Sequence, residues 1–563
     1  MNSITYQDKP WLKHYDEGVP ANLQYETCTL PDTLHETVAK YPERKAFYFQ
    51  GYEMTYRAFG DAVKRMAGAL EQFGIGKGDR VAILLPNVIP CAIAYYAILE
   101  LGGIVVMNNP LYTDPELEHQ LNDSGSVCLV VLDLLANRMI DLRGKTKVKQ
   151  IVVTSIGDYL PFPKNLLFKM LGKKKGVAAS VKSAERVYRF KDLLKQTAPR
   201  GAATPCSYDD IAMYQYTGGT TGLSKGVMLS HGNLGKQVQQ IDAWNPSRDR
   251  ESYEVVMGAL PLFHIYGLTC ILALAVSGGM GVVLVPKPQP DLLLEALHTY
   301  KPNYVALVPT MYIGLLNHPK MNDMDLKFIE HCYSGSAPLP VEVSNAFEEL
   351  TGERVNEGFG MTESSPVAHS SPSNGLIKPG SIGVPIIDTS CRIVDLEEGI
   401  EDMPVGEVGE LIIKGPQVMQ GYLNRPDETA KTLRDGWLYT GDIAKMDEDG
   451  YFYIVDRKKD MILSGGYNVY PRDIDEVLFE HPQVAEACAV GMPHPTRGEQ
   501  ITAFVVLHVG QQASEKDIID FCATKLAVYK LPTSVVFRSE LPKSTVGKVL
   551  RKELRKQEAA HVG

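Results

Sequence analysis

Short β-rich apolar runs alternate with amphipathic stretches over roughly the first 310 residues, and this alternation limits the possible folds more than any other feature. The apolar runs include "RVAILLP" at 80–86, "CLVVLD" at 128–133 and "YVALVP" at 304–309, while "AFGDAVKRMAGALEQFG" at 58–74 is typical of the stretches between them. Buried parallel strands joined by crossover helices produce this pattern. We therefore predict an α/β fold with parallel-rich sheets.

The 563 residues exceed the size at which one hydrophobic core keeps growing, so at least two domains are expected. Around residue 400 the pattern changes to strands that follow one another across glycine turns, as in "GELIIKGPQVMQGYLN" at 409–424. Beyond Asp456, short helices and strands alternate over about 100 residues, enough for a compact α+β domain. We predict a large domain over 1–456 that includes a small β-rich subdomain, and a small mobile domain over 457–563.

Composition excludes several classes of protein. The net charge of −10 argues against a nucleic-acid partner, which needs a basic face. Nine cysteines show no metal-ligand spacing, which indicates buried thiols in a reducing compartment without disulfides, and the N-terminus lacks a signal-like apolar region. Residues 255–286 carry no Asp, Glu, Lys or Arg, but Pro261, Gly267 and "SGGMG" divide them into a short buried helix and a buried strand. We expect a cytoplasmic protein.

Residues 161–190 are unusually basic. They contain eight Lys or Arg residues and a single acid, Glu185, interleaved with "LLF", "ML" and "VYRF". A solvated surface excursion is one interpretation of this segment. A peripheral contact with anionic lipid, on the inner face of the cell membrane, is the other.

The stretch "YTGGTTGLSKG" at 216–226 follows a strand-like run and contains four glycines, three threonines, a serine and a lysine. Backbone N–H groups freed by glycine, together with hydroxyls, form a concave anion site that suits a polyphosphate. The order of residues does not match the Walker A pattern, because Lys225 is followed by Gly226. A flexible turn remains an alternative for this loop taken alone.

Further motifs accompany the loop in a fixed order along nearly the whole chain. They are "PLFHIYG" (261–267), "YSGSAPLP" (333–340), "NEGFGMTESSP" (356–366), "GELIIKGPQVMQGYLN" (409–424), "GWLYTGDIA" (436–444), "DRKKDMILSGGYNVYPRDIDEV" (456–477) and "LPKSTVGKVLRKEL" (541–554). Together with the loop they resemble the core motifs of adenylate-forming enzymes. The stretch 435–459 and "NNPLYTDPELEHQLNDSG" (108–125) are similar to bacterial long-chain fatty acid:CoA ligases.

This resemblance implies activation of a medium- or long-chain fatty acid by ATP to an acyl-adenylate, followed by transfer to coenzyme A with release of AMP and pyrophosphate. It implies Mg²⁺ near Thr217 and Glu363. The ATP and AMP site implied by the motifs comprises Thr217, Gly218, Gly219, Thr220, Thr221, Gly222, Lys225, Glu357, Gly358, Phe359, Gly360, Thr362, Asp442, Arg457 and Lys548. Phe359 stands where many relatives carry tyrosine, and its ring still provides a stacking face.

The same resemblance assigns the remaining roles. Lys548 would bridge the carboxylate and the α-phosphate during adenylation, and Lys459 would be the hinge between the domains. The acyl group would lie against His264, Tyr266, Gly335, Ser336 and Ala337, and the catalytic residues would be Lys548, His264, Glu363 and Thr217. Gly465 and Gly466 would let the backbone approach coenzyme A.

Three alternatives stay open. The first is a fatty acyl-AMP ligase that passes its adenylate to a carrier protein, although the run from Gly436 to Lys459 leaves little room for the insertion expected of such enzymes. The second is an acyl- or aryl-CoA ligase with another specificity, because motifs do not determine the acyl pocket. The third is a non-catalytic interaction protein, which would be expected to have lost Glu363, Asp442 or Lys548. A homodimer is also compatible with the sequence.

Overall fold

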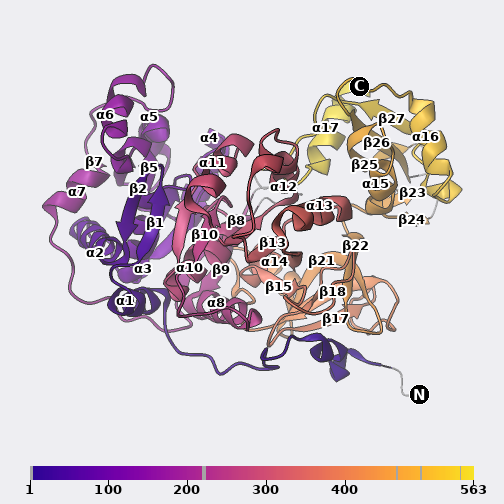
Figure 1. Cartoon of the computed structure of the whole chain (residues 1–563), viewed down its shortest axis with the longest axis horizontal. Helices are drawn as coiled ribbons and strands as arrows, with labels where there is room; N and C mark the ends of the chain where they lie inside the picture. Colours follow the sequence, from indigo (N-terminus) through magenta and orange to yellow (C-terminus); the bar gives the residue numbers. More distant parts are fainter. Residues whose placement is uncertain (1–3, 218–223, 465–466, 495–497, 545–546, 563) are drawn as a thin grey trace.

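The computed structural model describes residues 4–562 apart from 218–223, 465–466, 495–497 and 545–546. The fold contains two large mixed sheets whose strands interleave along the chain, a smaller β-rich subdomain and a C-terminal α+β unit (Figure 1). The C-terminal unit lies at one end of the molecule, and the region around α6 lies at the other (Figure 1). The predicted α/β class is confirmed.

The first large sheet has eight strands in the order β19-β9-β8-β4-β3-β5-β6-β7. Their bounds are β3 (Arg80–Leu84), β4 (Ile104–Met107), β5 (Cys128–Leu132), β6 (Gln150–Thr154), β7 (Val187–Arg189), β8 (Ile211–Thr217), β9 (Lys225–Ser230) and β19 (Gly421–Tyr422). The strands from β8 through β7 pair in parallel, whereas β8–β9 and β9–β19 are antiparallel. Every residue of β5 is buried, as expected for a parallel strand covered on both faces.

The second large sheet has nine strands in the order β16-β15-β14-β13-β12-β10-β11-β1-β2. Their bounds are β1 (Lys45–Phe49), β2 (Tyr52–Thr55), β10 (Val255–Gly258), β11 (Gly281–Leu284), β12 (Tyr304–Leu307), β13 (His331–Ser334), β14 (Val355–Gly360), β15 (Val367–Ser370) and β16 (Val384–Pro385). Strands β1 and β10 to β14 pair in parallel, and antiparallel strands close both edges.

Helices join and cover these sheets. Their bounds are α1 (Leu30–Lys40), α2 (Tyr56–Gln72), α3 (Ile89–Glu100), α4 (Asp114–Ser124), α5 (Asp133–Leu142), α6 (Lys164–Leu171), α7 (Phe190–Gln196), α8 (His231–Trp244), α9 (Ile265–Gly267), α10 (Leu274–Gly278), α11 (Pro290–Tyr300), α12 (Pro309–Leu316) and α13 (Val341–Thr351), with a π-helical turn, η5 (Leu268–Ala273), between α9 and α10. Thr29, Thr55 and Ser230 cap the first turns of α1, α2 and α8 by accepting a backbone N–H. All twelve residues of α3 are buried, which explains why its sequence is apolar on every side.

The long uncharged stretch 255–286 forms β10, the short helical segments α9, η5 and α10, and β11. The predicted helix and the strand after it are present, whereas β10 and the division of the helix into three segments were not predicted. Across the described residues, no helix combines the length and the apolar character that crossing a membrane would require.

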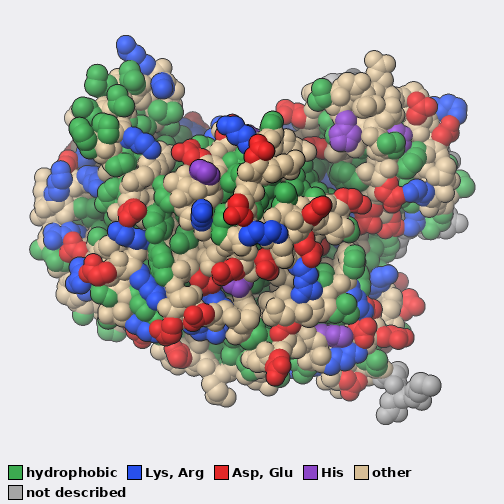
Figure 2. Space-filling view, in the orientation of Figure 1, with side chains coloured by type: hydrophobic (Ala, Val, Ile, Leu, Met, Phe, Trp, Pro, Cys, Tyr) green, Lys and Arg blue, Asp and Glu red, His purple; other side chains and the backbone are tan. Residues whose placement is uncertain are grey.

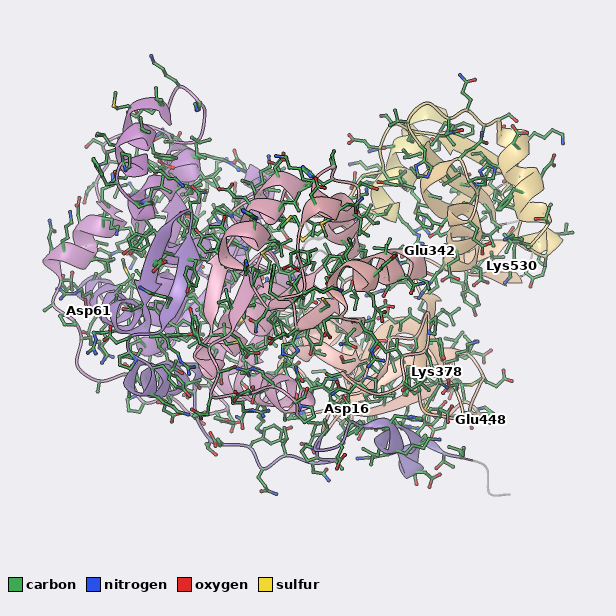
Figure 3. All side chains as sticks on the ribbon, in the orientation of Figure 1. Asp16, Asp61, Glu342, Lys378, Glu448 and Lys530 are labelled. Atoms are coloured by element: carbon green, nitrogen blue, oxygen red, sulfur yellow. The ribbon has the colours of Figure 1, made fainter. Side chains whose placement is uncertain are left out.

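The predicted β-rich subdomain contains β17 (Ser390–Val394), β18 (Gly409–Lys414), β20 (Leu433–Arg434), β21 (Trp437–Met446) and β22 (Phe452–Arg457), with α14 (Pro426–Thr432) between β19 and β20. Lys378, labelled in Figure 3, donates to Asp447 Oδ2 at 2.6 Å and to Asp449 Oδ2 at 2.8 Å. This contact ties the segment before β16 to the turn between β21 and β22.

The C-terminal unit has the strand order β24-β23-β26-β25, with β27 paired to β26. It contains β23 (Ile462–Ser464), β24 (Tyr467–Val469), α15 (Pro471–Phe479), β25 (Val484–His494), β26 (Gly498–Leu507), α16 (Glu515–Ala523), β27 (Ser534–Phe537) and α17 (Arg551–Val562). Ile462, Ile474 and Ile501 belong to a core cluster that is separate from the main one. A separate core is what an independent domain requires.

Candidate active site

A cavity of about 1260 Å³ lies where the end of β8, the ends of β13 and β14, the β-rich subdomain and residues 543–555 come together. Ligands of open α/β sheets bind beyond the carboxyl ends of the strands, which is where this cavity lies. Its volume exceeds the ~300–1,000 Å³ of typical small-molecule pockets and so has room for more than one ligand group.

Most of the site residues predicted from the sequence line this cavity. They are Thr217, Lys225, His264, Tyr266, Gly335, Ser336, Gly358, Phe359, Gly360, Thr362, Glu363, Arg457, Lys459 and Lys548. Glu357, Ala337 and Asp442 are not among the lining residues. Gly218, Gly219, Thr220, Thr221, Gly222, Gly465 and Gly466 lie outside the described residues.

Antiparallel strands β8 and β9 bring the two ends of the glycine-rich loop together, because Thr217 and Lys225 are paired in register. Helix α4 anchors the base of this loop: Gln120 Nε2 donates to Ser224 Oγ at 3.0 Å, and His119 Nε2 lies 3.0 Å from Ser224 O. Thr217 and Lys225 therefore reach the cavity side by side from two paired strands.

Glu363 lies opposite this hairpin in the short helix η7 (Thr362–Ser364). Glu363 is buried and lines the cavity. Its Oε1 accepts a hydrogen bond from the Tyr422 hydroxyl at 2.7 Å. A carboxylate oriented in this way is a hard oxygen ligand of the kind that Mg²⁺ prefers together with substrate phosphates.

Strands β14 and β21 form the part of the cavity where the sequence predicts the nucleoside to bind. Phe359 faces the cavity, and the His369 ring packs edge-on behind it with centroids 5.7 Å apart. Gly360 has no room for a side chain, since a Cβ there would lie 1.9 Å from Pro366 O. Asp442 forms an ion pair with Arg457, whose Nε is 2.5 Å from the Asp442 Oδ1.

The Oδ2 atom of Asp442 is buried and has no hydrogen-bond partner among the described residues. Burial raises the pKa of this carboxyl, and the nearby Arg457 guanidinium opposes that shift. A buried acceptor without a partner is costly unless a ligand donates to it. This observation supports Asp442 as an acceptor for hydroxyl groups, although Asp442 does not itself form the cavity surface.

Lys548 enters the cavity on the loop before α17. Gly547 adopts φ +76°, and a Cβ on it would lie 2.5 Å from Thr310 Oγ1 of α12, so only glycine lets this loop approach the main body so closely. The Lys548 side chain lines the cavity and is exposed there. Desolvation, together with the Arg457 charge, lowers the pKa of Lys548 to about 8.

Aromatic and small side chains line the remaining wall of the cavity, which is the predicted acyl side. His264 caps α9, with its Nδ1 3.2 Å from the Tyr266 N–H, and burial lowers the pKa of its imidazole to about 4. His264 is therefore neutral near pH 7. Trp244, Cys270, Tyr304 and Tyr333 also line the cavity, and none of them was predicted as a site residue.

Two further residues near Lys225 and Glu363 were not predicted as site residues. Tyr422 lies within one of the recognised motifs but received no role, and Glu428 of α14 forms an ion pair with Lys225. Lys225 and Glu428 are about two hundred positions apart, and no sequence motif links them. The pairing of β19 with β9 brings them together in the fold.

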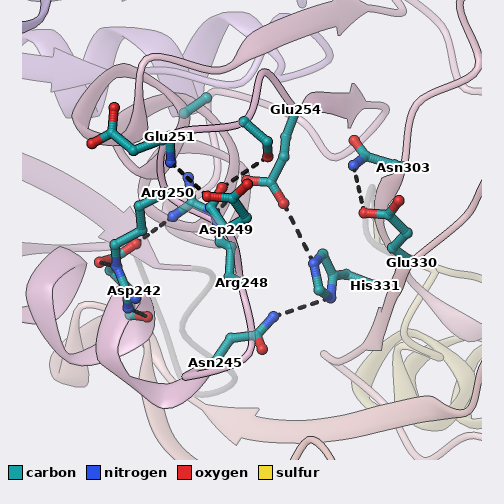
Figure 4. Close-up of polar contacts among 12 residues, drawn as sticks. Asp242, Asn245, Arg248, Asp249, Arg250, Glu251, Glu254, Asn303, Glu330 and His331 are labelled. Atoms are coloured by element: carbon teal, nitrogen blue, oxygen red, sulfur yellow. Dashed lines mark hydrogen bonds and ion pairs between the residues drawn. The ribbon is translucent and has the colours of Figure 1, made fainter.

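Within the part of the chain that the structure describes, one group of three side chains has ligand atoms close enough together to hold a metal ion, namely Glu254, Glu330 and His331. Each of them already has a protein partner (Figure 4): Glu254 pairs with buried Arg248, His331 contacts Asn245 and Glu254, and Glu330 accepts from Asn303. We interpret this group as a partly buried network of ion pairs and hydrogen bonds that ties the segment before β10 to β13.

Comparison with known proteins places the chain in a family. The model of the AMP-binding enzyme family matches residues 34–423, and that of the AMP-binding enzyme C-terminal domain matches residues 473–548. The chain belongs to the AMP-binding enzyme family.

A protein from Bacillus subtilis (strain 168) named long-chain-fatty-acid–CoA ligase is 44% identical over 552 residues, which cover 98% of each chain. Among solved structures, ATP-bound MatB from Rhodopseudomonas palustris has a TM-score of 0.82 at 29% identity and covers 96% of this chain and 100% of its own. The anthranilate CoA ligase AuaEII in complex with anthranoyl-AMP has a TM-score of 0.84 at 25% identity, covering 99% and 100%.

Proposed function

We propose that this protein is an AMP-forming acid–thiol ligase that activates a medium- or long-chain fatty acid and transfers it to coenzyme A. The observation that carries the proposal is the single cavity into which Thr217, Lys225, Glu363 and Lys548 all project. The names of relatives that match almost the whole chain support the choice of a fatty acid over an aryl acid.

In the first half-reaction, a carboxylate oxygen of the fatty acid attacks the α-phosphorus of ATP, and pyrophosphate leaves. Lys225 and Thr217 would bind the β- and γ-phosphates, and Lys548 would stabilise the negative charge that develops at the α-phosphate. Phe359 would stack on adenine, Thr362 would contact the α-phosphate, and Asp442 would accept from the ribose hydroxyls.

Mg²⁺ fits the phosphate end of the cavity, where Glu363 and Thr217 would hold it and where its charge would offset that of the phosphates. In the second half-reaction, the thiolate of coenzyme A attacks the acyl carbon, the C–O bond to the phosphate breaks, and AMP leaves. A rotation of residues 457–563 about Lys459 would withdraw Lys548 and bring Gly465 and Gly466 to the site.

Purified protein incubated with ATP, Mg²⁺, coenzyme A and a series of carboxylic acids tests this proposal. We expect the highest kcat/KM with medium- or long-chain fatty acids, and AMP and pyrophosphate as products. Faster turnover of an aryl acid would assign the chain a different substrate. Adenylate formation that proceeds while coenzyme A is not consumed would favour transfer to a carrier protein.

The pKa of Lys548 predicts a pH dependence. Only the protonated ammonium can stabilise phosphate charge, so kcat/KM for the adenylation step should be constant well below the pKa of about 8 and should fall as pH rises through it. Thioester formation from supplied acyl-AMP should lack this decline. Stopped assays of each half-reaction against pH measure both profiles, and a shared alkaline limb would contradict the assignment.

We also propose that the segment 161–190 binds anionic lipid. Helix α6 directs Phe168 inward against Gly157, which leaves several large apolar side chains exposed: Phe162 (80%), Met170 (65%), Leu166 (51%), Leu167 (51%), Leu171 (41%) and Val177 (40%). Hydrophobic side chains gather at this end of the molecule with Lys and Arg beside them (Figure 2). Among the described residues, Lys169, Lys173, Lys174 and Lys175 form no ion pair with an acid, so their charges remain available.

Each base near an anionic surface contributes about 1 kcal/mol, and salt screens this attraction. The protein should therefore co-sediment with vesicles that contain anionic lipid but not with purely zwitterionic ones. Replacement of Lys173, Lys174 and Lys175 by Glu should abolish this binding, while turnover of a short water-soluble acid stays unchanged.

The matched control replaces Lys147, Lys149 and Lys320 by Glu, since these exposed lysines lie outside the segment. Vesicle binding that is equal in the two triple variants would return the segment to the solvated-surface interpretation.

A further inference from the structure

Lys225, the lysine at the end of the phosphate loop, already has a negatively charged partner within the protein. Its ammonium pairs with Glu428 Oε2 of α14, and the side chains of Lys225 and Glu428 are 26% and 39% exposed. The same ammonium lies 4.9 Å from the centre of the Tyr422 ring. A phosphate chain that enters the cavity must therefore compete with Glu428 for this cation.

The position of Glu428 is well defined by the backbone around it. Tyr422 of β19 pairs with Val227 of β9, so the chain that leads into α14 runs beside the strand that carries Lys225. Thr429 Oγ1 accepts from the Tyr422 N–H and donates to Arg425 O, both at 2.9 Å, which fixes the first turn of α14. Glu428 is thus held within reach of Lys225 by the fold.

Tyr422 connects this ion pair to the metal-binding end of the site. Its hydroxyl donates to Glu363 Oε1, and burial followed by the Glu363 charge raises its pKa well above the ordinary value, so it remains a donor. Lys225, Tyr422 and Glu363 form one connected group. A change in the partner of Lys225 therefore occurs next to the groups that would hold the phosphates.

We propose that Glu428 is a positioning residue that forms an ion pair with Lys225 when no phosphate is bound. The ion pair would break when phosphates bind Lys225 and would form again as pyrophosphate departs. This inference rests on the proposed function, because it assumes that Lys225 binds the β- and γ-phosphates. Glu428 weakens pyrophosphate binding in two ways: it competes for the Lys225 ammonium, and its carboxylate repels the phosphates once the pair is broken. The same two effects raise the KM for ATP.

The test compares Glu428→Gln with the wild type. The amide keeps the shape of the side chain and removes its charge, so Mg²⁺-pyrophosphate should bind about two- to fivefold more tightly, as expected for one partly exposed ion pair. Calorimetric titration of the free protein measures this affinity without any carboxylic acid. Pyrophosphate should inhibit the overall reaction at a correspondingly lower concentration, and the KM for ATP should fall.

Asp427→Asn is the matched control, because Asp427 lies on the same helix, is exposed and forms no ion pair within the described residues. This variant loses the same charge but should bind pyrophosphate like the wild type. In a Lys225→Ala background the gain from Glu428→Gln should shrink, since one of its two sources is absent. High salt should reduce the gain in every case.

Equal pyrophosphate affinity in the Glu428→Gln and Asp427→Asn variants would overturn the proposal. An undiminished gain in the Lys225→Ala background would also overturn it, because Glu428 would then act by repulsion alone. Turnover of a fatty acid by the wild type, measured on the same preparation, tests the proposed function separately. If the wild type did not turn over a fatty acid, the proposed function would fail, but the pyrophosphate titration would still test the role of Glu428.

Discussion

Replacement of Lys548 by alanine should slow acyl-adenylate formation by about 10²–10³-fold, the loss typical of removing one group that stabilises developing charge. Thioester formation from supplied acyl-AMP should stay within about twofold of the wild type, because no phosphate charge develops in that step. In the structure Lys548 lines the cavity near Arg457 and Asp442, as a role in adenylation requires.

Pyrophosphate release and thioester formation are measured separately for this variant. Lys556→Ala is the control, because Lys556 is an exposed lysine of α17 that does not line the cavity. It should retain both activities. Equal losses of both half-reactions in the Lys548→Ala variant would contradict a role confined to adenylation.

Replacement of Lys459 by proline should leave adenylation within about threefold of the wild type and slow overall turnover by at least about tenfold. Proline fixes φ near −65°, which restricts rotation at the proposed hinge. Among the described residues, the Lys459 N–H donates no hydrogen bond, so proline removes none here. The arrangement that places Lys548 in the cavity should therefore persist, while the second arrangement becomes hard to reach.

Lys459→Ala is the control for loss of the side chain, which itself lines the cavity. Both half-reactions should be measured on both variants, together with their thermal unfolding. Normal overall turnover of the proline variant would exclude Lys459 as the hinge.

The central strands of both large sheets could be predicted from the sequence because burial on two faces leaves continuous apolar runs. Strands β3, β5 and β12 each match a predicted run, and the uncharged stretch 255–286 divides as its proline and glycine residues indicate. The antiparallel edges β15, β16 and β19 were not predicted. They are short, and their pairing depends on partners distant in sequence.

The candidate site divides in the same way. Residues such as Thr217, Glu363 and Lys548 lie in motifs, and the fold brings them to one cavity. The Glu428 carboxylate and the cavity-lining rings of Trp244, Tyr304 and Tyr333 could not be predicted, because their contacts are created by tertiary packing. Asp442 shows a further limit: a motif indicates which residue is present but not that its side chain pairs with Arg457 and is absent from the cavity lining.

Transfer of an oxygen isotope tests the proposed acyl-adenylate most directly. A fatty acid labelled with ¹⁸O in its carboxylate is converted by the enzyme with ATP, Mg²⁺ and coenzyme A, and the products are analysed by mass spectrometry. If the carboxylate oxygen attacks the α-phosphorus and the C–O bond then breaks, AMP should carry one ¹⁸O atom and pyrophosphate none. Label in inorganic phosphate with formation of ADP, or unlabelled AMP beside labelled acyl-CoA, would contradict an acyl-adenylate intermediate.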